Sequence, residues 1–210
     1  MNNLFSFFED NISTINNANL SNGVKLENKL IDKTYLEFTS MFNGAYFFNN
    51  SLHFFRCGHE VIDYQDIQLI NKIIFKYYKN FLNDMLFFFA EDVFGNLFGF
   101  EQSEKIIMFN IESGDKEVIS SDFNNYLNAL FNDIEYFTGR KYASDPAISN
   151  QLNKGYRLCP KYPFVLGGEY SSINLTLKWF EENYIFNSDI ARQIKNHPDG
   201  TNFTISIISN

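Results

Sequence analysis

Apolar residues recur at three- and four-residue spacing in several segments, which is the pattern of helices that bury one face. This spacing predicts helices over residues 4–20, 32–43 and 122–137, a further helix that starts at Asp63 or Asp66 and ends at Tyr78, and shorter ones over 145–154 and around 190–194. Asp32 and Asp122 stand immediately before two of these patterns, where an N-cap residue is expected. The chain is therefore expected to begin with two helices, which precede the first strands.

Short segments rich in β-branched and aromatic residues lie between these helices. Asn49, Asn50 and Ser51 form a turn signal between two aromatic runs, which predicts a hairpin. Strands are predicted over residues 45–48, 52–55, 85–90, 97–100, 106–110, 117–120, 156–158, 173–177 and 202–208. We therefore predict one α+β domain with an antiparallel sheet of about six strands, carrying helices on one face and leaving the other face available.

Composition and charge restrict the class of partner. The chain has 210 residues, 45% of them hydrophobic, and its 25 Phe and 12 Tyr predict an aromatic core. Its net charge of −8 disfavours direct binding to nucleic acid, which rewards Lys and Arg. The same charge suits the capture of a basic protein, although an ordinary soluble protein would carry it too.

The expected compartment follows from what the chain lacks. Cys57 and Cys159 are its only cysteines and match no disulfide framework or metal motif. Residues 1–10 do not resemble a secretory signal, and the apolar run 85–90 is far shorter than the roughly 20 residues that span a bilayer. We expect a cytoplasmic protein that does not associate with membranes.

One local pattern is compatible with catalysis. Cys57 and His59 flank Gly58, and in an extended segment both side chains would point to one side, as a thiolate and its base require. The sequence supplies no orienting group, oxyanion site, nucleotide motif or paired metal-ligand spacing. A small-molecule hydrolase stays an alternative, but we expect no enzyme activity, no cofactor and no metal.

Residues 89–100, FAEDVFGNLFGF, resemble the central strand–turn–strand signature of the SUKH superfamily of bacterial immunity proteins. Other segments resemble this family in the same order: FTSMFNGAYFF at 38–48, Phe123 with Tyr126 and Leu127, and RLCPKYPFVLGGEY at 157–170. The resemblance covers about residues 30–208, so residues 1–25 are expected to form an N-terminal helical extension and 26–210 a SUKH-like domain. In the signature, Asp92 and Gly95 are suited to shaping the turn, whereas the family's Trp before an Asn is missing ahead of Asn71 and Asn80.

The resemblance implies an immunity protein that binds a cognate secreted toxin, often a nuclease, and occludes its active site. A basic toxin would then meet an acidic, aromatic surface of this chain. Candidate contact residues are Glu91, Asp92 and Glu101 near the signature, and Glu169 and Tyr170 in the Gly-Gly-Glu-Tyr segment. The alternative of the same fold is a scaffold that binds proteins without inhibiting them.

Overall fold

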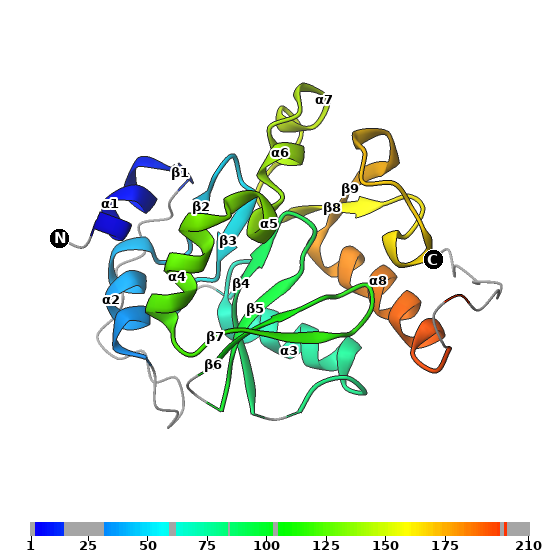
Figure 1. The fold of residues 1–210 in the computed structure, drawn as a ribbon, viewed down its shortest axis with the longest axis horizontal. Helices are drawn as coiled ribbons and strands as arrows, with labels where there is room; N and C mark the ends of the chain where they lie inside the picture. Colours follow the sequence, from blue (N-terminus) through cyan, green and yellow to red (C-terminus); the bar gives the residue numbers. More distant parts are fainter. Residues whose placement is uncertain are drawn as a thin grey trace.

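The computed structural model describes residues 3–14, 32–58, 62–83, 85–102, 105–197 and 200 (Figure 1). Its helices are α1 (Asn3–Asp10), α2 (Lys33–Phe42), α3 (Ile67–Tyr78), α4 (Phe123–Asn132), α5 (Ile134–Thr138), α6 (Arg140–Ala143), α7 (Pro146–Ser149) and α8 (Phe180–Ile194). The strands are β1 (Ile12–Thr14), β2 (Tyr46–Phe47), β3 (Leu52–Phe54), β4 (Leu86–Asp92), β5 (Leu97–Glu101), β6 (Lys105–Phe109), β7 (Lys116–Ser120), β8 (Tyr156–Pro160) and β9 (Leu175–Trp179). Short 3₁₀ turns, η1 (Phe164–Leu166) and η2 (Ser172–Asn174), lie between β8 and β9.

The main sheet has the order β1-β2-β3-β4-β5-β6-β7, and each strand pairs antiparallel with the next. This confirms the predicted α+β domain with an antiparallel sheet. The sheet has seven strands, because β1 from the N-terminal segment adds to the edge of the predicted hairpin β2–β3. A second sheet consists of β8 and β9 alone.

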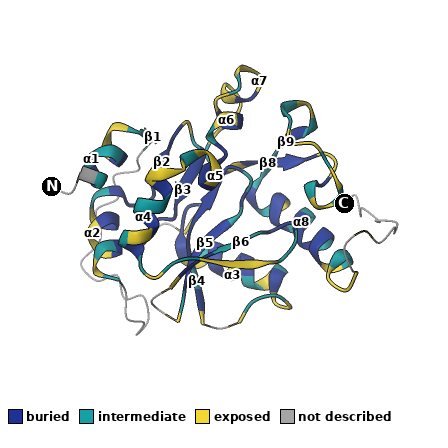
Figure 2. Ribbon diagram, in the orientation of Figure 1, coloured by how far each residue is buried: buried dark blue, intermediate teal, exposed yellow. Residues whose placement is uncertain are grey.

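Helices cover both faces of the main sheet, so the expectation of a single covered face is wrong. On one face the ring of Phe89 contacts Tyr35 of α2 and Phe123 of α4. On the other face Phe88 contacts Phe75 of α3. Figure 1 shows α4 in front of the sheet with α3 and α8 behind it, and Figure 2 shows that the central strands between these layers are largely buried. The aromatic residues thus pack on both faces of the sheet, within one continuous core.

The N-terminal segment belongs to the same core. The predicted helix 4–20 ends at Asp10 in the structure, and the chain continues into β1. Phe8 is fully buried against Phe38 and Phe47. Residues 15–31 and the strand expected over 202–208 lie outside the described residues.

The C-terminal third forms a small layer of β8, β9 and α8 beside the main sheet, at the end farthest from α1 and α2 (Figure 1). Here Leu158, Leu175 and Ile148 build a second apolar cluster with Val93 of the β4–β5 turn. None of the described helices, of which α8 is the longest, combines the length and apolar character needed to cross a membrane.

Candidate partner-binding surface

Glu91 lies in a buried ion cluster that we define as His53, Glu91, Arg157 and Tyr184. The Glu91 carboxylate lies 2.7 Å from Nη2 of Arg157 and 3.1 Å from Nδ1 of His53, and it accepts a hydrogen bond of 2.6 Å from the Tyr184 hydroxyl. All four residues are at most 2% exposed. Glu91 is therefore a structural residue, and its assignment as a partner contact is wrong.

The surroundings in this cluster shift the pKa values of Glu91 and His53. Burial alone would raise the pKa of Glu91, but the charge of Arg157 and the hydrogen bond from His53 lower it to about 2. Burial lowers the pKa of His53 to about 4, so its imidazole is neutral at pH 7 and stacks on Tyr46 with ring centroids 3.9 Å apart. Since β3, β4, β8 and α8 each supply one member, the cluster joins the C-terminal layer to the main sheet.

His53 is expected to stay neutral until the pH falls to about 4. Its ordinary pKa is 6.5, so between pH 6.5 and 4 the unfolded chain binds more protons at this site than the folded chain. The stability that His53 contributes is therefore complete above pH 6.5 and is lost as the pH falls to 4. Titration of the ring by NMR measures this directly, and a midpoint near 6.5 would contradict the buried neutral form.

Asp92 shapes the turn of the signature, as predicted, and this role removes it from the surface. Its carboxylate accepts hydrogen bonds from the backbone N–H groups of Phe94 and Asn96, both at 2.8 Å, and from the Asn96 amide at 2.9 Å. Burial raises the pKa of Asp92 to about 7. Gly95 follows with φ +93°, and a Cβ there would lie 2.7 Å from the Asn183 amide, which explains the glycine. Asp92 is only 4% exposed and is not available to a partner.

Glu101 lies apart from the other candidate residues. It ends β5, at the opposite end of that strand from the signature turn. Its carboxylate is partly exposed and forms a 2.7 Å ion pair with Nζ of Lys116 on β7. The structure does not bring it together with Glu169 or Tyr170.

Glu169 and Tyr170 are exposed in the loop between β8 and β9, residues 161–174, which we name the β8–β9 loop. Besides Tyr170, this loop exposes apolar side chains that were not among the predicted contacts. Tyr162 is 56%, Tyr170 63% and Ile173 85% exposed, and Val165 is also exposed. An irregular segment that presents several large apolar side chains to solvent is typical of a surface that another protein covers.

The side chains of Glu112 and Asn174 hold the backbone of the β8–β9 loop through hydrogen bonds. The carboxylate of Glu112, from the β6–β7 connection, accepts hydrogen bonds from the N–H groups of Phe164 and Val165 at 2.8 and 3.0 Å. Burial raises the pKa of Glu112. The Asn174 side chain accepts from the N–H of Tyr162 and donates to its carbonyl, both at 2.9 Å. The loop is therefore held in one shape before any partner arrives, which reduces the entropy lost on binding.

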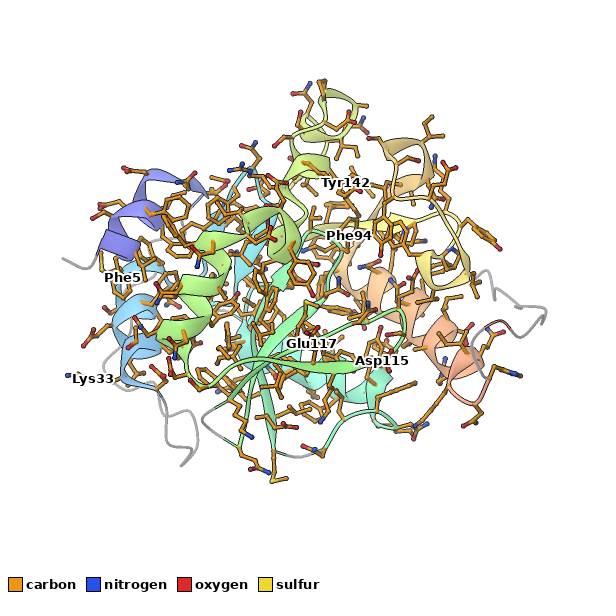
Figure 3. All side chains as sticks on the ribbon, in the orientation of Figure 1. Phe5, Lys33, Phe94, Asp115, Glu117 and Tyr142 are labelled. Atoms are coloured by element: carbon orange, nitrogen blue, oxygen red, sulfur yellow. The ribbon has the colours of Figure 1, made fainter. Side chains whose placement is uncertain are left out.

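Aromatic rings support the loop from beneath. Phe164 and Tyr170 stack with centroids 3.8 Å apart and an angle of 7° between their planes. Phe94 of the signature turn contacts the edges of Phe164 and Tyr142, and the Tyr142 hydroxyl donates to the Tyr170 carbonyl at 3.1 Å. Figure 3 shows Phe94 and Tyr142 close together beside the loop. The signature thus contributes to this surface through Phe94.

Cys57, the nucleophile of the catalytic alternative, lacks the features of a reactive thiol. Cys57 is buried, and burial raises the pKa of its thiol to about 11, which is opposite to the shift of a reactive thiolate. Its Sγ lies 3.6 Å from the Tyr35 hydroxyl. His59 lies outside the described residues, and among those that are described no three His, Cys, Asp or Glu side chains gather as metal ligands.

Comparison with known proteins adds support for the fold. No family model matches the sequence, and no curated protein matches it. The structure is similar to the crystal structure of Atu4351 from Agrobacterium tumefaciens, with a TM-score of 0.59 over 84% of this chain and 85% of that one. The two sequences are 14% identical in this alignment, so the similarity shows a shared α+β fold.

Proposed function

We propose that this chain is an immunity protein that binds a cognate protein toxin through the β8–β9 loop and blocks its active site. The observation that carries the proposal is the loop itself, since its backbone is fixed by Glu112 and Asn174 while Tyr162, Tyr170 and Ile173 stay exposed. Rigid aromatic anchors surrounded by polar groups are the residues that dominate the affinity of tight protein complexes. A protein that acts in this way needs no catalytic residue of its own.

The charge of the chain supports a basic toxin as the partner. A net charge of −8 would accelerate association with a basic protein such as a nuclease and would make the association rate fall as salt rises. The resemblance of residues 89–100 to the SUKH signature supports the same assignment, since the signature turn supplies Phe94 beneath the loop. The proposed site of action is the cytoplasm of the cell that carries the toxin gene.

Coexpression tests this function. The probe is the toxin-like C-terminal module of a large secreted protein encoded beside this chain, expressed alone and together with it. Growth arrest by the module alone and normal growth with the chain present are the expected results. Arrest at equal or excess amounts of this chain would refute the assignment, and a module that binds the chain but is harmless alone would favour the non-inhibitory scaffold.

A matched pair of double variants tests the binding surface. Replacing Tyr162 and Ile173 with serine should weaken the complex by roughly 30-fold or more, as expected when an anchor worth about 2 kcal/mol is removed. The control replaces Val118 and Tyr136 with serine, because these residues are 55% and 57% exposed outside the loop. The control should bind as the wild-type chain does. If both variants bind the toxin with wild-type affinity, the toxin contacts another surface.

A further inference from the structure

Within the β8–β9 loop, Tyr170 is an exposed residue whose ring is covered on one face by another aromatic ring. Phe164 stacks on that face at 3.8 Å, and Phe94 meets the ring nearly perpendicularly at 6.4 Å between centroids. The side chain is nevertheless 63% exposed, so the opposite face of the ring is open. The hydrogen bond from the Tyr142 hydroxyl to the Tyr170 carbonyl holds the backbone, and the stack on Phe164 orients the ring.

Two carboxylates belong to the surroundings of Tyr170. Glu169 precedes Tyr170, is exposed, and its carboxylate forms no ion pair or hydrogen bond within the described part of the chain. Glu112 lies beneath the loop, and burial together with the charge of Glu112 raises the pKa of the Tyr170 hydroxyl. An aromatic face is itself negative, so these groups all favour a cation above the ring.

The cations of the neighbouring segments already have partners. Nζ of Lys161 donates to the Ile173 carbonyl at 2.7 Å. Nζ of Lys141 lies 4.8 Å from the centroid of the Tyr142 ring, which is a cation–π contact of the same type on the adjacent aromatic ring. The nearby cations among the described residues therefore leave the face of Tyr170 available to a cation from outside the chain.

We propose that the open face of Tyr170, together with the carboxylate of Glu169, binds an arginine side chain of the partner protein. Arginine fits better than lysine because its planar guanidinium stacks on an aromatic ring while its N–H groups reach a carboxylate. This inference rests on the proposed function, since the arginine belongs to the basic toxin. It adds the residue type that the toxin presents to the loop.

A small probe tests the site without the toxin. N-acetyl-arginine amide is titrated into the full-length chain, and its δ-methylene protons are followed by NMR. Stacking on the ring predicts upfield shifts of these protons that saturate, together with shifts of the Glu169 and Tyr170 amides. The control probe is N-acetyl-citrulline amide, which has nearly the same shape without the charge. Equal shifts with citrulline would overturn the proposal, because recognition would then not depend on charge.

Substitutions test whether the Tyr170 ring and the Glu169 carboxylate bind the probe. Tyr170→Leu should abolish the upfield shift, Tyr170→Phe should keep it, and Glu169→Gln should weaken binding by roughly twofold to fivefold. Both positions are exposed, and an unchanged amide spectrum elsewhere confirms the fold of each variant. An upfield shift that persists in Tyr170→Leu would refute the site. A chain that protects against the toxin but does not bind the probe would keep the proposed function and overturn only this inference.

Discussion

Replacing Arg157 with methionine should lower the free energy of unfolding by about 3–5 kcal/mol, because Glu91 is then left buried without its cation. Arg157 is fully buried, and its guanidinium also donates to the Tyr156 carbonyl at 2.9 Å and lies over the ring of Tyr46. A hydrophobic side chain of similar length preserves much of the packing, so most of the expected loss is electrostatic. Urea denaturation at pH 7 measures it.

The double variant Arg157→Met with Glu91→Gln separates charge from packing. It should be more stable than Arg157→Met alone, because the amide removes the unpaired charge and keeps an acceptor for the Tyr184 hydroxyl. In the single variant, burial without Arg157 should raise the pKa of Glu91 above that of the unfolded chain. The loss of unfolding free energy in Arg157→Met should then shrink as the pH falls from 7 to 5, since Glu91 takes up a proton in the folded state. If the loss of stability is the same at both pH values and is not reduced by Glu91→Gln, lost packing is responsible.

The elements that were predicted correctly depend on residues close together in the chain. Asp32 and Asp66 accept hydrogen bonds from N–H groups two and three residues later, and Asp122 from one three residues later. The hairpin at Asn49 and Asn50 follows from their positive φ of 59° and 66°, which asparagine tolerates better than most residues. Local geometry decides these features, so the local sequence predicts them.

The partners of Glu91 could not be predicted, because they are distant in the chain. His53, Arg157 and Tyr184 reach it from other elements, and an acidic pair beside a turn is more often solvated. The same limit applies to the β8–β9 loop, where Glu112 and Phe94 are the groups that fix its shape. Only the Gly-Gly-Glu-Tyr segment indicated that this loop is exposed. The helices α3 and α8 were predicted, but their position on the second face of the sheet was not, because alternation along a strand does not reveal whether that face is also covered.

Asn71 provides the second large predicted effect. From the buried face of α3 its amide donates to the carbonyl of Phe88 at 2.7 Å, and its Oδ1 accepts from the Phe88 N–H at 2.9 Å. These bonds satisfy the backbone of β4 where the register shifts between Phe88 and Ala90. Asn71→Leu leaves both buried groups of Phe88 without a partner and should destabilise the fold by about 2–5 kcal/mol. Chemical denaturation provides the measurement.

Asn128 is the matched control for Asn71. It is a partly buried asparagine in α4 whose amide donates to the carbonyl of Asn124 within the same helix. Asn71 makes the same kind of bond to the carbonyl of Ile67, so the two positions differ mainly in the pair of bonds to Phe88. Asn128→Leu should change stability by no more than about 1 kcal/mol. Similar losses in the two variants would show that the amide of Asn71 does not stabilise the irregular register of β4, and the signature strand would then owe its shape to aromatic packing alone.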